Sequence, residues 1–414
     1  MEKLKLPIQV EYILNKLVSK GYEAYVVGGC VRDSIMGVEP NDWDICTNAL
    51  PNDIMSVFEN HKIIPTGLKH GTVTLVIDNK NYEITTFRID GEYTDGRHPD
   101  EVMFVNDLKL DLMRRDFTIN SMAYNHKCGI VDYFGGIDDI KNGIIRCVGN
   151  PYERFQEDAL RMMRAIRFSI KYEFDIEEKT MNSLIESSDL LKKVSMERIN
   201  SELSQTISYN LTTDKLSHLV KLLYVVVPEL KEKELDELCC DVSSSYGSLE
   251  FILACLFDFE LDGLKEILQR LRYSNDVIDS VVKINKYGHQ ILENIILTDD
   301  IHKSEYLEPG YYERKLLSDI GYDLALDAID FAMIHSPTYE TILIALYNRV
   351  VKSFKKDSIY SLSRLDINGN DLINIGYKGK DIGTTLNLLL DMVMRDEIVN
   401  VKPELIAKAI KMKK

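Results

Sequence analysis

The sequence predicts an α+β fold, in which a small N-terminal sheet-and-helix domain precedes an all-helical remainder. Short β-rich runs are concentrated in the first part of the chain; residues 72–77 and 82–87 are two of them, and the connection DNKN (78–81) predicts that they form a hairpin. Beyond about residue 205 the apolar residues recur at helical spacing and strand signals are few. A chain of 414 residues is also long enough for more than one domain.

The net charge, the cysteines and the lack of long apolar runs limit the classes of protein to which this chain can belong. The net charge of −16 repels a polyanion at long range, so a nucleic-acid partner must be held by a local basic strip and released by salt. Seven scattered cysteines without a CxxC pair are typical of free thiols in a reducing cytosol, not of a disulfide frame or zinc site. Residues 1–20 form an amphipathic pattern interrupted by charges, not a signal peptide, and no apolar run has membrane-spanning length. We therefore expect a cytoplasmic protein.

The stretch from residue 25 to residue 44 combines a glycine turn with two acidic residues. It predicts a strand, a turn at Gly28 and Gly29, a helix carrying Arg32, and a second strand carrying Asp42 and Asp44. Glycines without Cβ atoms let the backbone approach a phosphate, and a helix N-terminus favours an anion. The alternative is that the glycines only form a tight turn.

Asp42 and Asp44 stand two apart on the predicted strand, so both carboxylates project from one face. Paired carboxylates beside a phosphate cradle suit Mg²⁺ and nucleotidyl transfer through two metal ions. Glu83, on a predicted neighbouring strand, is a candidate third carboxylate, although an exposed edge glutamate fits the residues equally well.

Two further stretches carry chemistry. In residues 108–120, which have helical spacing, Arg114 and Arg115 suit triphosphate oxygens, and Asp116 and Asn120 suit a ribose. In residues 154–168, three arginines recur along one helical face, one turn after an aspartate; these are Asp158, Arg161, Arg164 and Arg167. From spacing alone, the first stretch also fits an exposed, self-paired helix end, and the second a salt-bridged helix with a basic strip.

These motifs, in this order, resemble the tRNA nucleotidyltransferase/poly(A) polymerase family, in the branch of the bacterial class II CCA-adding enzymes. The shared stretches are residues 25–44, GLKHGTV (67–73), RRDFTIN (114–120), EDALR (157–161) and VSMERINSEL (194–203). The resemblance implies that Asp42, Asp44 and Glu83 are catalytic, with Asp42 and Asp44 as Mg²⁺ ligands. It implies a nucleotide-binding set of Gly28, Gly29, Arg32, Arg114, Arg115, Asp116, Asn120, Asp158, Arg161, Arg164 and Arg167.

Within that set, the resemblance gives Asp158 and Arg161 the reading of the base. Asp158 would accept from the exocyclic amine that C and A share, and would reject the carbonyl oxygen of U and G. Arg164 and Arg167 would serve the triphosphate or the tRNA backbone, and residues 194–203 would brace the reading helix. Residues 88–101 are polar and match the family's flexible loop; the retained DGRHP (95–99) favours addition of the terminal A.

The resemblance also implies four parts: a catalytic head (1–150), a neck (151–205), a helical body (206–310) and a tRNA-binding tail (311–414). In the tail, Gly376, Gly379 and Gly383 flank a predicted helix start, where amides could hold a tRNA phosphate or simply cap and pack the helix. No histidine–aspartate pair of the phosphohydrolase type is evident in the helical part.

The predicted activity is template-independent addition or repair of the tRNA 3′-terminal CCA from CTP and ATP, releasing pyrophosphate. Alternatives are an A-adding enzyme with a separate CC-adding partner, a poly(A) polymerase, an inactive RNA-binding protein, and a sugar-nucleotide or antibiotic nucleotidyltransferase. The expected partner is tRNA, not DNA or a membrane. The sequence sets no expectation for the oligomeric state.

Overall fold

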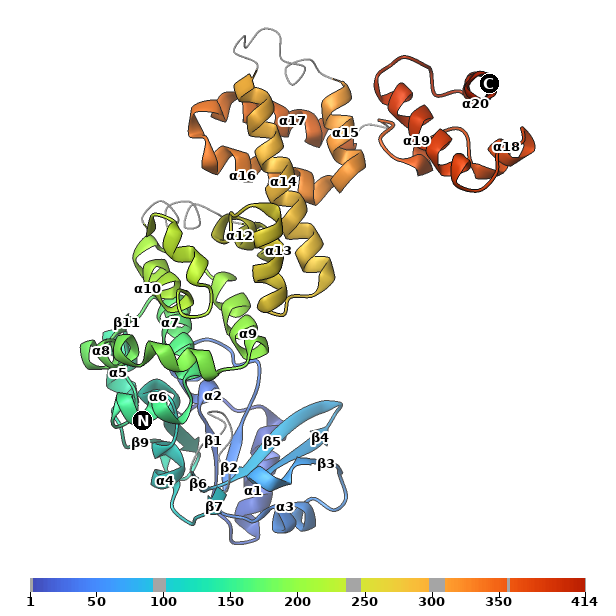
Figure 1. Ribbon diagram of the computed structural model, residues 1–414. Helices are drawn as coiled ribbons and strands as arrows, with labels where there is room; N and C mark the ends of the chain where they lie inside the picture. The colour runs from blue at the N-terminus through green and yellow to red at the C-terminus, as the bar shows by residue number, and fades with distance from the viewer. Residues whose placement is uncertain (1–2, 92–101, 236–246, 298–309, 356–357, 414) are drawn as a thin grey trace. The chain divides into compact units, whose positions relative to one another are not determined.

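The computed structural model describes residues 3–91, 102–235, 247–297, 310–355 and 358–413. The chain divides into two compact units, Met1–Leu235 and Asp236–Lys414. The first unit contains the sheets, and the described part of the second unit consists of helices and connections (Figure 1). The predicted α+β class is confirmed, and the finer division at residues 150, 205 and 310 stays a prediction.

A seven-stranded mixed sheet forms the centre of the first unit. Its strand order is β3-β4-β5-β2-β1-β8-β9. Strands β2 and β5 pair in parallel, and the other neighbours pair antiparallel. The strands are β1 (Ala24–Val27), β2 (Ile45–Thr47), β3 (Lys62–Gly67), β4 (Thr72–Ile77), β5 (Lys80–Thr86), β8 (Met122–Asn125) and β9 (Gly129–Asp132).

The predicted hairpin between residues 72 and 87 is present, with its turn at Asp78 and Asn79. Ile77 pairs with Lys80, and both turn residues have positive φ, at 50° and 60°. Two successive residues with positive φ give the twist that a two-residue hairpin needs, and Asp and Asn tolerate this conformation.

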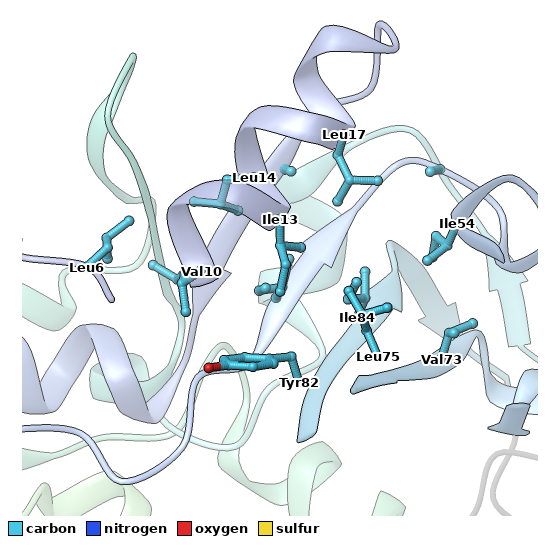
Figure 2. Close-up of a cluster of buried hydrophobic side chains, with 14 of the residues drawn as sticks. Leu6, Val10, Ile13, Leu14, Leu17, Ile54, Val73, Leu75, Tyr82 and Ile84 are labelled. Carbon is cyan, nitrogen blue, oxygen red and sulfur yellow. The ribbon is translucent and has the colours of Figure 1, made fainter. Parts of the chain in front are cut away.

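Alternation along the strands divides the sheet into two faces. On one face, Val73, Leu75, Tyr82 and Ile84 pack with α1 (Ile8–Ser19) and α3 (Pro51–Val57), as Figure 2 shows. On the other face, a smaller cluster joins the sheet to α4 (Leu108–Met113); it contains Tyr25, Val27, Cys46, Phe87, Leu108, Leu112 and Ala123. The period of two therefore leaves Glu83, between Tyr82 and Ile84, outside the first core.

The first unit also contains further helices and two small sheets. The remaining helices are α2 (Gly29–Ile35), α5 (Gly136–Asn142), α6 (Pro151–Glu157), α7 (Leu160–Tyr172), α8 (Glu178–Ser187), α9 (Met196–Ile207) and α10 (Thr213–Leu223). Two small sheets pair β6 (Arg88–Asp90) with β7 (Val102–Phe104) and β10 (Ile144–Ile145) with β11 (Asp175–Ile176).

Two apolar clusters can be traced in the described part of the second unit, in addition to the buried apolar residues of α12, α13 and the first part of α14. One draws on α14–α17 and the other on α18–α20 with the segment before them. The helices are α12 (Leu249–Leu256), α13 (Leu261–Arg270), α14 (Asn275–Leu297), α15 (Tyr311–Ile320), α16 (Tyr322–His335), α17 (Glu340–Lys355), α18 (Gly369–Asn374), α19 (Lys380–Met394) and α20 (Lys402–Met412). Helix α19 starts directly after Gly379, which has φ +57°. In the described segments, no helix meets the length and hydropathy needed to span a membrane.

One carboxylate of α16 makes a testable contribution to stability. Burial, and then the neighbouring Asp327 carboxylate, raise the pKa of Asp330 to about 6. The unfolded chain ionises this group near pH 4, so its contribution to stability falls as pH rises from about 4 to about 6. Asp330→Asn removes that cost, and we expect it to raise the free energy of unfolding at pH 8 by about 1–3 kcal/mol, at 1.36 kcal/mol per pKa unit before solvent screening.

Chemical denaturation of the variant at pH 4 and pH 8 measures this effect. The gain should be small at pH 4, because Asp330 is then protonated in the folded protein. Asp323→Asn, the same change at an exposed position of α16, is the control. An equal gain at both pH values would contradict the prediction.

Candidate active site

The predicted catalytic aspartates lie immediately before β2, not within it. Asp42 and Asp44 are both exposed, whereas Trp43 between them packs partly against the main core. Their backbone is nevertheless extended toward the sheet, because the Val27 amide donates to the Asp44 carbonyl at 3.0 Å. The strand pairing therefore extends one residue beyond the end of β2, to Asp44, and the Asp42 carboxylate is near enough for its charge to raise the pKa of Asp44.

Parallel pairing brings the third carboxylate to the same place. Ile45 pairs with Ile84 in the β2–β5 ladder, so Glu83 is the neighbour of Asp44 across the sheet. Reduced hydration, then Asp44, then Asp42 raise the pKa of Glu83. Reduced hydration also raises the pKa of Asp44; Arg115 opposes this rise and Asp42 adds to it. The three carboxylates thus form an acidic cluster beside the interior strands β2 and β5, where they repel one another, and a cation would relieve that repulsion.

The donor set fits a hard divalent cation held by two carboxylates. In the described part of the chain, no group of three or more His, Cys, Asp or Glu side chains is arranged to hold one metal ion. Mg²⁺ usually takes only one or two protein carboxylates and completes its shell with waters and substrate phosphates. Asp42 and Asp44 match that smaller requirement.

The glycine turn adjoins this acidic cluster, because Val27, just before Gly28, is hydrogen-bonded to Asp44. Gly28 has φ +80°, which favours glycine, and a Cβ there would lie 2.9 Å from Nη1 of Arg115. A side chain at position 28 would therefore collide with the Arg115 guanidinium. At Gly29 a Cβ would meet Nη2 of Arg32 at 3.4 Å. The turn thus has two guanidinium groups against bare backbone, and the Arg115 group acts on the Asp44 carboxylate.

Arg32, Asn120 and Asp116 form a chain of contacts. Arg32 is buried and donates to Oδ1 of Asn120 and, at 2.9 Å, to Oδ1 of Asp33. Asn120 donates in turn to Oδ1 of Asp116 at 3.0 Å. The polar groups predicted to face a ribose are therefore also bonded to one another.

Asp116 joins the sheet domain to α7. Nε and Nη2 of Arg164 donate to its Oδ2 at 2.9 and 2.7 Å. Burial opposes ionisation, but the Arg164 charge and the Asn120 hydrogen bond hold the pKa of Asp116 at about 2. Asp116 therefore carries a full negative charge at neutral pH.

The predicted helical stretch 108–120 ends earlier than its spacing suggests. Helix α4 stops at Met113, after which Phe117 bridges to Cys147 and the Val148 amide donates to the Asp116 carbonyl. Pairing with this second segment replaces the helical hydrogen bonds. Arg114 and Arg115 consequently lie at the turn that leaves the helix.

Sequence reasoning missed Asp111, which stabilises these two arginines. It is fully buried; its Oδ1 accepts from Nη2 of Arg114 at 2.8 Å, and its Oδ2 lies 3.6 Å from Nη2 of Arg115. Burial opposes ionisation, but the two guanidinium groups lower the pKa of Asp111 overall. Its spacing three and four residues before the arginines was the available signal.

The predicted base-reading helix is broken at Asp158. Helix α6 ends at Glu157, Asp158 is extended, and α7 begins at Leu160. Oδ1 of Asp158 accepts from the Leu160 amide at 3.1 Å, and both of its oxygens accept from Arg198, at 3.1 and 2.8 Å. A cap and a distant guanidinium together outweigh helical continuity here.

Arg161 does not pair with Asp158. Its Nη1 donates to Glu157 at 2.7 Å and its Nη2 to the Arg114 carbonyl at 3.0 Å. The two residues still flank the same helix break, and Arg161 is held beside the turn of Arg114. Arg167, the last arginine of the stretch, donates to Glu202 of α9 at 2.6 Å.

The polar stretch 88–101 is a loop only in part. Arg88–Asp90 forms β6 and pairs with β7, so the loop contains fewer residues than predicted. Arg88 donates to the His70 carbonyl and, at 3.0 Å, to Asp90. The DGRHP segment (95–99) lies outside the described residues.

The chain matches known proteins over most of its length. Family models described as the poly A polymerase head domain, the probable RNA- and SrmB-binding site of polymerase A, and the putative domain 2 of tRNA nucleotidyltransferase match residues 24–146, 173–234 and 248–409. The CCA-adding enzyme of Ligilactobacillus salivarius is 36% identical over 415 residues, which cover 97% of this chain and 95% of the relative. The chain belongs to the CCA-adding enzyme family. The CCA-adding enzyme of Lactobacillus helveticus is also 36% identical, with 98% and 97% covered.

Solved structures agree with this membership in the CCA-adding enzyme family. The Bacillus stearothermophilus CCA-adding enzyme in complex with CTP superposes with a TM-score of 0.76 at 29% identity, covering 99% of this chain and 98% of that one. The Thermotoga maritima CCA-adding enzyme complexed with tRNA shows the same fold, with a TM-score of 0.70 at 22% identity and 98% and 95% covered. The family resemblance predicted from the motifs is confirmed, and the roles of individual residues stay predictions.

Proposed function

We propose that this protein is a template-independent tRNA nucleotidyltransferase that builds or repairs the 3′-terminal CCA from CTP and ATP in the cytosol. The observation that carries the proposal is the convergence of Asp42, Asp44 and Glu83 beside the Gly28 turn and its Arg115 guanidinium. An acidic cluster next to a cationic, Cβ-free turn suits a metal–triphosphate substrate. The CCA-adding relatives named above support the choice of reaction.

In the proposed reaction, the oxygen of the tRNA 3′-hydroxyl attacks the α-phosphorus of the nucleotide. The bond from that phosphorus to the oxygen bridging to the β-phosphate breaks, pyrophosphate leaves with the displaced electron pair, and the proton of the hydroxyl passes to solvent water. Asp42 and Asp44 would hold Mg²⁺, which when bound lowers the pKa of the hydroxyl and neutralises charge on the leaving group. Glu83 adds negative charge beside them, and Arg115 and Arg32 lie where phosphate oxygens would approach the turn.

Base choice is assigned to the break between α6 and α7. Asp158 is held by Arg198 and the Leu160 amide in one orientation, and its Oδ2, which accepts only from Arg198, retains a second lone pair for the exocyclic amine of C or A. Arg161 is the cationic group on the other side of the break. A fixed protein acceptor thus takes the place of a nucleic-acid template.

The proposed partner is tRNA, recognised by shape as double-stranded RNA usually is. On a chain of net charge −16, such binding must rely on local basic groups. We therefore infer that affinity for tRNA falls steeply between about 50 and 200 mM salt. The logarithm of the affinity should fall linearly with the logarithm of the salt concentration, with a slope roughly proportional to the number of phosphates contacted.

Extension assays with one nucleotide at a time test the proposed function. We expect CTP alone to add two residues to a tRNA lacking CCA, ATP alone to add one residue to a tRNA ending in CC, and both together to stop after three. Chelation of divalent cations with EDTA should abolish every addition. Extension only of the CC-ending tRNA would identify an A-adding enzyme, long A tails would identify a poly(A) polymerase, and no extension would refute the proposal.

A further inference from the structure

The ring of Phe168 lies beneath three guanidinium groups. Phe168 belongs to α7, is only 4% exposed and packs edge-on against Phe117, with centroids 5.8 Å apart. The guanidinium carbons of Arg167, Arg164 and Arg32 lie 4.4, 5.2 and 5.3 Å from its centroid. Arg32 comes from the glycine-turn helix α2, so one ring connects the turn with α7.

Each of these arginines also has a carboxylate or amide partner. Arg164 pairs with Asp116, Arg167 with Glu202, and Arg32 with Asn120 and Asp33. These partners occupy N–H groups in the plane of the guanidinium. An aromatic face attracts the same cation through its quadrupole without using an N–H donor.

That difference matters most for Arg164. Its side chain is 32% exposed, whereas those of Arg32 and Arg167 are 6% and 8% exposed. Asp116 takes Nε and Nη2 of Arg164, and Nη1 is 3.5 Å from Glu202. A ring beneath the guanidinium holds the cation in place while leaving donor capacity for an incoming anion.

The ring also lowers the cost of crowding like charges. Three guanidinium groups around one side chain repel one another, and a hydrocarbon of neutral polarity would leave that repulsion unrelieved. The negative face of an aromatic ring is attracted to all three. Tyr172 extends the arrangement, because it stacks on Phe168 at 5.9 Å and lies 4.8 Å from Arg32.

We propose that Phe168 is a positioning residue that, through its aromatic face, holds Arg164 and Arg32 in the orientation that binds the nucleotide triphosphate. The proposal rests on the proposed nucleotidyltransferase function and adds to it a residue that does not itself touch substrate. It predicts that affinity for a nucleoside triphosphate depends on the electron density of this ring and not only on its shape.

Stepwise fluorination tests the role of the ring face. Incorporating 4-fluoro-, 3,5-difluoro- and 3,4,5-trifluorophenylalanine at position 168 withdraws electron density while nearly preserving shape. We expect the Kd for CTP, measured by calorimetry without tRNA, to rise progressively by about threefold to thirtyfold across the series. The KM for CTP in extension should rise in parallel, with a smaller change in kcat.

Phe155 supplies the matched control. It is fully buried on α6, and among the described residues no cationic group lies over its ring. The same fluorinated residues at position 155 should leave the Kd unchanged, and thermal melting of each variant reports folding. A flat Kd across the position 168 series overturns the proposal for Phe168, whereas CTP binding by a wild-type protein that does not extend tRNA overturns only the proposed reaction. A wild-type protein that does not bind CTP overturns both.

Discussion

Asp42→Asn and Asp44→Asn are each expected to lower the rate of CMP incorporation at least about a thousandfold, with folding intact. Each change keeps the side-chain shape and removes one of the two carboxylates assigned to Mg²⁺. Loss of metal-based charge stabilisation in the transition state is worth about 4 kcal/mol or more, which corresponds to three powers of ten. Single-turnover extension of a tRNA lacking CCA, with CTP alone, measures the effect.

Stability distinguishes this loss from misfolding. The pKa of Asp44 is raised in the folded protein, so its ionised form is disfavoured there at neutral pH. Asp44→Asn removes that cost and should leave the melting temperature unchanged or higher. Asp138→Asn is the matched control, because Asp138 is exposed in the same unit and its ion pair, with Lys141 at 3.5 Å, lies on the surface. Activity above a tenth of the wild-type rate in Asp42→Asn would remove the metal-ligand assignment.

Local signals predicted the fold well where neighbouring residues decide the conformation. The Asp78–Asn79 turn was readable because its residue types tolerate positive φ. The sequence placed Glu83 on a neighbouring strand, whereas the structure shows that Glu83 lies opposite the core and that the parallel β2–β5 pairing brings it to Asp44. That pairing is non-local, which is why residues alone left Glu83 undecided.

The side-chain partners within the site were not predictable, because they join distant segments. Asp158 bonds Arg198, 40 residues away, and Asp116 bonds Arg164, 48 residues away. The sequence around Asp158 contains no Gly or Pro, so helical spacing indicated continuity where the structure has a break.

A cluster in the second unit was not predictable for the same reason, since its members come from distant segments. Asp258 contacts His289 at 2.7 Å and His335 at 3.5 Å, although no histidine–aspartate pair was evident in the helical sequence. Three separate segments meet there, and periodicity within one helix carries no information about such a meeting.

Asp158→Asn is expected to lower the preference for CTP over UTP by about 10-fold to 100-fold. A well-placed hydrogen-bonding pair contributes about 1–3 kcal/mol of discrimination between bases. The carboxylate accepts only, whereas an amide can present an N–H to the carbonyl of uracil. The ratio of kcat/KM values for the two nucleotides, measured on a tRNA lacking CCA, reports the change directly.

The structure adds a condition to that test, because Arg198 donates to both oxygens of Asp158. An asparagine keeps one acceptor for Arg198, so Asp158→Asn disturbs the break between α6 and α7 less than alanine would. Asp175→Asn, the same change at an exposed site of the first unit, is the control. An equal fall in kcat/KM for CTP and for UTP, together with a lowered melting temperature, would show that Asp158 only stabilises the break between α6 and α7. A rise in kcat/KM for UTP relative to CTP, at an unchanged melting temperature, would instead show that the Asp158 carboxylate selects the base.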